Sequence, residues 1–162
     1  MWPFTFSHRF AVSGAEAQGL WPFLKGTLVS ELSKRKAAYL RTTAHDVAFM
    51  GGLFRFVAST NLLVAVSCGS VTASAEKDNL AVRYELSFLE LFVMSVIGGL
   101  FMAFASLGKL SAWGSRGLGL FFFLFFFLVN REICIWRFDS FIKECMRMST
   151  ERKAEMKESQ PG

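Results

Sequence analysis

Residues that could carry chemistry are few in this chain and are scattered along it. The two histidines, His8 and His45, have no cysteine or carboxylate neighbours at the spacing of metal ligands. The three cysteines show no C-x-x-C spacing, and an odd number cannot form a closed set of disulfides. No motif of a hydrolase, a phosphate-binding loop or a dinucleotide-binding fold occurs. We therefore expect a protein that is not an enzyme and holds no metal or cofactor.

One charged residue inside an apolar segment is the main candidate for a specific contact. Arg55 lies within the stretch 47–68, which is otherwise largely apolar. Ionisable residues at membrane depth are candidates for a functional contact. Three interpretations stay open: the guanidinium reaches the headgroups near Asp46, it lies over phenylalanine rings of neighbouring helices, or it binds a lipid phosphate or a carboxylate of another subunit.

Two further functions depend on the same segment. Arg55, Ser59, Thr60 and Asn61 would form the polar lining of a small transporter or channel component. His45 together with Arg55 would instead support a haem-binding or quinone-binding membrane anchor. Both functions are alternatives to a scaffolding role.

The composition places the chain in a membrane. Hydrophobic residues make up 52% of the 162 residues, and 19 residues are Phe. A soluble domain of this size has too little interior to bury so many large apolar side chains. Three apolar stretches, 47–68, 86–108 and 117–136, each have about the 20 residues that cross a hydrocarbon core. We expect an all-α integral membrane protein with three transmembrane helices in the region 46–136, and no nucleic-acid partner because no nucleic-acid-binding motif accompanies the net charge of +5.

A short motif occurs twice, as "MGGLFRFVAS" and as "IGGLFMAFAS". Because the second copy lies inside a strong candidate span, the repeat favours a span for the first copy too. Small residues spaced four apart let two helix backbones approach closely in a membrane. The small residues expected to pack the spans together are Ala48, Gly51, Gly52, Ser95, Gly98, Gly99 and Ala103.

The N-terminal flank, 1–45, combines aromatic and basic residues. The string "WPF" occurs twice in it, and we expect Trp2 and Trp21 to lie at the membrane interface. A short amphipathic helix is predicted over 24–41. Its basic residues, expected to contact another subunit or anionic lipid such as cardiolipin, are Lys34, Arg35 and Lys36.

The third span is expected to continue as a helix beyond the bilayer, into the polar extension 137–162. Residues 130–158 contain no Pro or Gly, and apolar residues recur there at alternating spacings of four and three. Charged residues cover the rest of the helix surface. The apolar stripe predicts a surface for a partner and consists of Phe138, Phe141, Cys145 and Met148.

Membrane orientation stays open at this level. Three spans would place nearly equal numbers of Lys and Arg on the two sides, so the positive-inside rule does not choose between them. Two spans, with 47–68 outside the bilayer, would put both basic ends on one side, but the repeated motif argues against this arrangement. Residues 69–85 are small and polar and are predicted to form a loop.

The general build resembles that of supernumerary subunits of mitochondrial respiratory complexes and ATP synthases. The features that carry the resemblance are a small basic chain, few spans, aromatic anchors and long polar extensions. The resemblance implies a non-catalytic accessory subunit in the mitochondrial inner membrane. Its partners would be other membrane subunits, which it would help to hold together.

Overall fold

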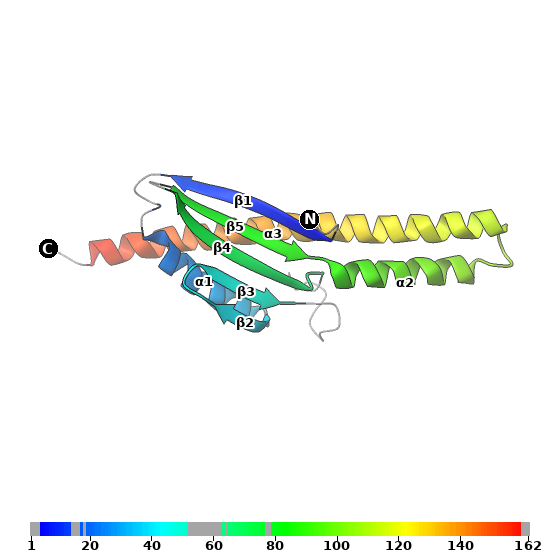
Figure 1. Cartoon of the computed structure of the whole chain (residues 1–162), viewed down its shortest axis with the longest axis horizontal. Coiled ribbons are helices and arrows are strands. Elements are labelled where there is room, and N and C mark those ends of the chain that lie inside the picture. The colour runs from blue at the N-terminus through cyan, green and yellow to red at the C-terminus, as the bar shows by residue number, and fades with distance from the viewer. Residues whose placement is uncertain are drawn as a thin grey trace.

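The computed structural model describes residues 4–13, 17, 19–51, 63, 65–76 and 79–159. These residues form a five-stranded antiparallel sheet and helices that extend well beyond it (Figure 1). The second half of α3 passes along the sheet, and its first half projects away together with α2 (Figure 1). The elements in chain order are β1 (Thr5–Ser13), α1 (Leu20–Lys34), β2 (Ala38–Thr42), β3 (Asp46–Met50), β4 (Cys68–Glu76), β5 (Asn79–Ser87), α2 (Leu89–Ala105) and α3 (Ala112–Glu158).

The sheet has the strand order β1-β5-β4-β3-β2. Strands β2 to β5 therefore follow one another as a meander, and β1 pairs with the outer side of β5. The register aligns Thr5 with Ser87, Ser87 with Cys68, and Cys68 with Met50. We call this row the hairpin end of the sheet, because it adjoins the helical hairpin formed by α2 and α3. Helix α2 begins two residues after Ser87.

Alternation of apolar and polar residues decides which face of the sheet is covered. In β5 the apolar residues at every second position are buried, whereas Arg83 and Glu85 between them are exposed. The adjacent strands repeat this pattern in register. The buried positions on the covered face are Val47, Phe49, Val71, Ala73, Leu80, Val82, Tyr84 and Leu86.

The covered face packs on α1 and on the second half of α3. Phe138 is fully buried, and its ring lies 5.8 Å from that of Phe49 and 5.0 Å from that of Tyr84. Ser149 of α3 meets Thr27 of α1, with 3.2 Å between their hydroxyl oxygens. Helix α1 presents one buried stripe to this core, formed by Leu20, Leu24, Leu28 and Leu32.

The expectation of an all-α protein with three transmembrane helices is wrong. The stretch 47–68 lies mostly between two strands, since it begins within β3 and ends at the first residue of β4. The stretch 69–85, expected to be a loop, supplies most of β4 and β5, and the helix expected over 24–41 is divided between α1 and β2. Pairing between successive strands satisfies their backbone groups and overrides the weak local preferences of these segments.

Two small residues expected to pack transmembrane helices belong to the sheet region instead. Ala48 lies in β3, and Gly51 follows the end of that strand. The backbone N–H of Gly51 donates a hydrogen bond of 3.1 Å to the carbonyl of Ser67. Neither residue therefore packs a helix against another helix. Gly52, the next residue of the same group, lies outside the described residues.

Helices α2 and α3 are joined by a short loop and pack against each other as a hairpin along small residues. Their 17 and 47 residues correspond to about 25 Å and about 70 Å of helix. A Cβ atom on Gly99 would lie only 2.8 Å from the carbonyl oxygen of Gly119, so the two backbones are in direct contact there. Ser95 is buried one turn before Gly99, Ala103 contacts Gly119 one turn after it, and Gly98 packs on a phenylalanine ring of α3.

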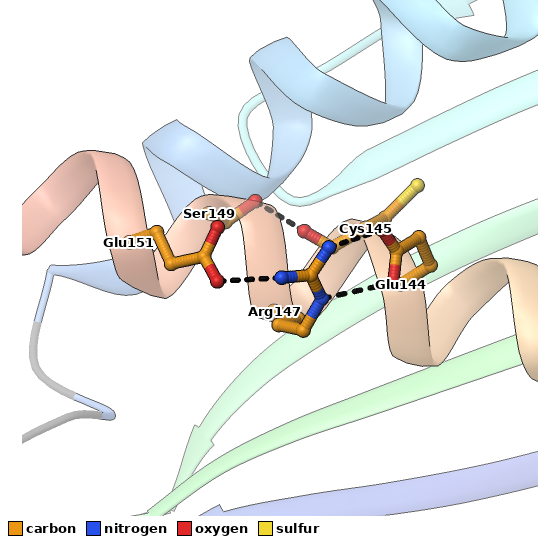
Figure 2. Close-up of polar contacts among 5 residues, drawn as sticks. All are labelled: Glu144, Cys145, Arg147, Ser149 and Glu151. Atoms are coloured by element: carbon orange, nitrogen blue, oxygen red, sulfur yellow. Dashed lines mark hydrogen bonds and ion pairs between the residues drawn. The ribbon is translucent and has the colours of Figure 1, made fainter.

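The second half of α3 carries many of its charges on the surface away from the core. Arg147 donates hydrogen bonds of 2.6 and 3.0 Å to Glu144 and one of 2.7 Å to Glu151 (Figure 2). On another side of the helix, the Ser149 hydroxyl donates to the carbonyl of Cys145 at 2.6 Å (Figure 2). Water and salt screen exposed ion pairs, so they add little to the free energy of unfolding. This half of the helix is therefore held mainly by its buried stripe.

Candidate membrane anchor and sheet groove

Exposed large hydrophobic residues concentrate on the hairpin. Of the 21 such residues in the described part of the chain, 18 lie from Leu89 to Trp136. Phe101 and Phe104 are each 69% exposed, and Phe121 is 65% exposed. Soluble monomers rarely expose a continuous apolar surface of this extent, and when they do it marks a contact with lipid or with another protein.

Helix α3 is, among the described helices, the one that is long and apolar enough to cross a membrane. Only 11% of its apolar 18-residue window is buried, whereas the equivalent window of a soluble core helix is largely covered. Helix α2 is also apolar but is shorter, at 17 residues. The first half of α3 thus combines the length of a membrane helix with the exposed surface of one.

Two exposed tryptophans lie at the ends of the apolar part of α3. Trp113 is 80% exposed and Trp136 is 71% exposed. Their separation in the sequence corresponds to about 35 Å of helix, slightly more than the thickness of a bilayer's hydrocarbon core. Tryptophan is enriched at the two interfaces of a membrane, where its ring contacts both lipid chains and polar headgroups.

The phenylalanines of the hairpin divide into a packed set and an outward set. Phe92 of α2 meets Phe123 and Phe127 of α3 edge to face, at centroid distances of 5.6 and 5.7 Å. Phe121 and Phe125 stack on each other at 5.9 Å and remain exposed. One side of α3 therefore joins the hairpin together, and the other side is available to lipid.

A second candidate surface is the open face of the sheet, on the side opposite α1 and α3. A groove of about 380 Å³ lies on this face. It includes residues of the row Thr5, Ser87, Cys68 and Met50, so it lies at the hairpin end of the sheet. Its polar and exposed lining includes Tyr39, Arg41, Met50, Cys68, Ser70 and Glu85.

Tyr39 has an unusual backbone conformation at the rim of this groove. Its φ angle is +49°, a region that residues other than glycine seldom adopt. The register between β2 and β3 shifts between Ala38 and Arg41, which accommodates this residue. The ring is 83% exposed, and Met50 beside the groove is 47% exposed. Backbone strain at an exposed aromatic residue favours a binding role, because such residues are enriched at protein interfaces.

Two charged residues, Arg41 and Glu85, line the groove. Glu85 forms an ion pair of 2.7 Å with Arg83 of the same strand. Arg41 is exposed and makes no ion pair within the described part of the chain. The groove therefore offers a guanidinium, an exposed aromatic ring and an exposed thioether to a bound molecule.

A polar cluster joins α3 to the sheet. Asp139 accepts a hydrogen bond of 3.4 Å from the Tyr84 hydroxyl and pairs with Lys143 at 2.7 Å. The Nε2 atom of His8 lies 4.0 Å from the same carboxylate. Burial, together with the charge of Asp139, raises the pKa of Tyr84 well above its usual value. The phenol therefore stays protonated and donates, which positions α3 on the sheet.

The basic residues expected to contact lipid lie at the end of α1. Lys34 and Arg35 form ion pairs of 2.6 and 2.7 Å with Glu31, and their hydrogen bonds lower the pKa of that carboxyl. Arg35 also lies 4.6 Å from the ring centroid of Phe141. Lys36 is exposed in a left-handed turn with φ of +58°. These contacts lie within the sheet domain, which we define as the five strands, α1 and the second half of α3. A lipid contact of these residues stays a prediction.

The aromatic and polar residues that the sequence singled out among the first 61 positions fall into two groups, those that the structure describes and those that it does not. The Trp21 indole N–H donates to the carbonyl of Ala44 at 2.6 Å, which ties α1 to the turn between β2 and β3. His45 is exposed in the same turn, at the end of the sheet opposite the hairpin end. The other candidates, Trp2, Arg55, Ser59, Thr60 and Asn61, lie outside the described residues.

The apolar stripe of the C-terminal extension faces the chain's own core. Phe138, Phe141 and Cys145 are buried against the sheet and α1, and Met148 packs partly buried beside them. Burial raises the pKa of the Cys145 thiol to about 12. The stripe is thus covered without a second protein, and a partner for it stays a prediction.

No group of three His, Cys, Asp or Glu side chains suited to a metal ion occurs among the described residues. The open groove was not anticipated from the sequence. A usable signal was present in β5, where Leu80, Val82, Tyr84 and Leu86 alternate with polar residues. That pattern would have predicted a sheet with one polar face, although not the strand order that brings Tyr39 and Cys68 to one groove.

Comparison of the chain with protein-family models, with curated proteins and with solved structures finds no match. The expectation of a multi-span helical subunit is wrong, because the fold is a sheet with one long apolar helix. Neither the fold nor the comparisons support a place in the respiratory chain, in ATP synthase or in mitochondria.

Proposed function

We propose that this protein is a membrane-anchored binding protein whose hairpin holds the sheet domain at the bilayer surface. The apolar 18-residue stretch of α3 carries the proposal, because it is long and apolar enough to cross a membrane and only 11% of it is buried. Lipid is the solvent that makes such a surface stable. Helix α2 is the antiparallel partner that returns the chain through the bilayer, and its 17 residues suit a locally thinned membrane.

The distribution of charge supports one orientation. Of the 18 Lys and Arg residues, two belong to the tip of the hairpin, Lys109 in the loop and Arg116 in the first turns of α3. Near the sheet end of the hairpin lie Arg83, Arg131 and Arg137, followed by further basic residues of α3. The positive-inside rule then places the sheet domain in the cytoplasm and the tip on the opposite side.

The open sheet face is the binding surface in this proposal. Its groove contains an exposed tyrosine with a strained backbone, an exposed methionine and an arginine without an ion pair to the described residues: Tyr39, Met50 and Arg41. Aromatic, methionine and arginine side chains are enriched where proteins bind one another. Because the groove lies at the hairpin end, its occupant is a protein segment held close to the membrane. The protein would act as a non-catalytic subunit that docks this segment.

Thiol labelling in sealed vesicles tests the anchor. Cys68 is exposed on the sheet, whereas Cys134 and Cys145 are buried. Lys109→Cys in a Cys68→Ser background places the reactive thiol at the tip. We expect a membrane-impermeant maleimide to label Cys68 from one side of the membrane and the tip thiol from the other. Labelling of both from the same side, or release of the protein by alkaline carbonate, would show that the hairpin does not span.

Exchange of the groove residue tests the binding role separately. Tyr39→Ala leaves the buried core intact, because Tyr39 is 83% exposed. Native gels of mildly solubilised membranes should show the wild-type chain in a larger assembly that the Tyr39→Ala variant leaves. Trp136→Ala, an exposed aromatic change away from the groove, is the matched control. A wild-type chain that migrates alone would contradict the docking role while leaving the anchor intact.

A further inference from the structure

The hairpin contains its own groove, close to the tip. A cavity of about 290 Å³ lies between α2 and α3, and its apolar lining comes from both helices. Gly99 and Gly119, where the two backbones touch, lie within this lining, and Ala103 adds a third small residue. The cavity lies beside this contact, because the side of each glycine that faces the other helix is filled by the opposite backbone. The other lining residues are Val96, Leu100, Leu120, Phe123 and Arg116.

Arg116 is the charged residue of this groove. It lies one turn inside α3, and its guanidinium carbon is 5.5 Å from the ring centroid of Trp113, on the side toward the tip. Side chains of a helix lean toward its N-terminus, which directs Arg116 from the groove toward the headgroup region. An apolar slot therefore leads up to a single positive charge near a membrane surface.

The charge around the tip is uncompensated. No Asp or Glu occurs between Glu90 and Glu132, so the tip carries Lys109 and Arg116 without an acidic residue on the hairpin beside them. A guanidinium binds phosphate with charge-assisted, often bidentate hydrogen bonds. The groove thus has an apolar part and, at the end near the tip, a phosphate-binding guanidinium. A phospholipid has the same two parts, apolar acyl chains and a phosphate.

We propose that this groove binds one anionic glycerophospholipid of the tip-side leaflet, with an acyl chain along Gly99, Ala103 and Gly119 and the phosphate on Arg116. The proposal rests on the membrane anchor proposed above. The lipid fills the cavity beside the helix contact and neutralises the charge of the tip. It would hold the distal end of the hairpin at a fixed depth in the bilayer.

Native mass spectrometry of the purified full chain tests the site with phosphatidylglycerol and phosphatidylcholine as probes. We expect one phosphatidylglycerol to be retained about tenfold more strongly than phosphatidylcholine, because the choline cation offsets the attraction between the tip charges and the phosphate that both lipids carry. Arg116→Gln should remove this preference, and Arg116→Lys should keep part of it. Lys109→Gln is the matched control, because it removes the same charge from the tip without lining the groove.

A second pair of variants separates the groove from the surface charge. Leu100→Trp fills the groove, whereas Ile97→Trp adds the same volume to α2 outside it, and the two native side chains are 55% and 54% exposed. Only the first should reduce retention of both lipids. Equal retention of the two lipids by the wild type, or equal losses in Arg116→Gln and Lys109→Gln, would overturn the lipid site.

The vesicle labelling distinguishes this failure from failure of the anchor. A tip thiol labelled from the side opposite Cys68, combined with no preference for phosphatidylglycerol, would leave the anchor standing and refute the lipid site. A tip thiol labelled from the same side as Cys68 would refute both.

Discussion

The two halves of α3 show opposite relations between composition and burial. The first half is strongly apolar, yet only 11% of its apolar 18-residue stretch is buried. The second half is rich in charged residues, yet it contributes the buried stripe of Phe138, Phe141 and Cys145. In water, a helix buries its apolar residues and exposes its charges, as the second half does. The first half follows the rule for a helix surrounded by lipid, where apolar side chains face outward.

One continuous helix contains both halves. Ala112–Glu158 is helical throughout, so in the proposed membrane anchor a displacement of the first half would be transmitted to the core beneath the sheet. The sheet cannot rotate freely about the anchor, because Phe138 on the same helix is enclosed by Phe49 and Tyr84. This arrangement fixes the orientation of the open groove relative to the first half of α3.

The largest difference between the halves should appear when the same residue type is truncated in each. Phe138→Ala opens a cavity in the sheet domain and should cost about 3–5 kcal/mol in free energy of unfolding. Phe125→Ala removes an outward ring that is 57% exposed and should leave the melting temperature nearly unchanged. Both variants are unfolded by heat in detergent, in a Cys68→Ser background. The melting temperature is measured from the reaction of the buried thiols with a fluorogenic maleimide as they become exposed. Equal losses would mean that Phe125 is also enclosed in the native protein.

Introducing a charge should have the larger effect in the first half of α3, which is the reverse of the order expected for the truncation of phenylalanine. Phe125→Lys places an ammonium in the middle of the apolar window and should cost about 2.5–3.5 kcal/mol of insertion free energy. Met156→Lys is the matched control, because Met156 is 56% exposed in the polar half. We expect carbonate extraction to release a fraction of Phe125→Lys but none of Met156→Lys. Full retention of both variants would argue that the first half of α3 does not contact lipid chains.

Alkaline pH should destabilise the sheet domain through its buried thiol. Burial raises the pKa of Cys145 to about 12, whereas an unfolded cysteine ionises at about pH 8.5. The stabilisation is complete below the unfolded pKa and is lost as the pH rises from about 9 toward 12, because only the unfolded state then releases the proton. The slope is at most about 1.4 kcal/mol per pH unit for this group.

The Cys145→Ala variant isolates this contribution. Its stability at neutral pH will be lower because a side chain is truncated, but its loss of stability between about pH 9 and pH 11 should be shallower than that of the wild type. Denaturant titrations at several pH values measure the slope. Parallel pH profiles for the two proteins would show that the Cys145 thiol ionises equally in the folded and unfolded states.

The smallest effect should come from the ion pairs on the polar half. Arg147→Ala removes the contacts to Glu144 and Glu151 shown in Figure 2. All three side chains are more than half exposed, so water replaces the lost contacts. The melting temperature should stay unchanged within error at physiological salt. A clear drop would indicate that these residues are covered by a partner in the native assembly.

The repeated motif shows how far local sequence can mislead. Met50, which begins the first copy, ends strand β3, whereas Ile97, which begins the second, lies inside α2. The inference of a span from the repeat was wrong, since strands β3 and β4 flank the first copy. Glycine and phenylalanine suit several structures, and neighbouring chain segments choose among them.

Some features followed from the sequence by physical necessity. The apolar stretch 86–108 contains α2, and the stretch 117–136 lies within α3, because continuous apolar runs of about 20 residues are too long for an ordinary strand and favour a helix. The stripe through Phe138 and Cys145 was correctly read as one face of a helix, because its spacing is local. The local spacing of these residues did not reveal that the sheet and α1 cover this face.

Only the tertiary structure decided the sheet and its groove. Strand β1 pairs with β5 over a long separation in sequence, from Thr5 with Ser87 to Ser13 with Asn79. Strand β4 is rich in Ala, Ser and Gly, which are weak strand formers. These segments become strands because each satisfies the backbone hydrogen bonds of the next. The sequence by itself determined the apolar hairpin and the periodicity of the stripe. Long-range pairing determined that the stripe covers its own sheet and that the opposite face stays open.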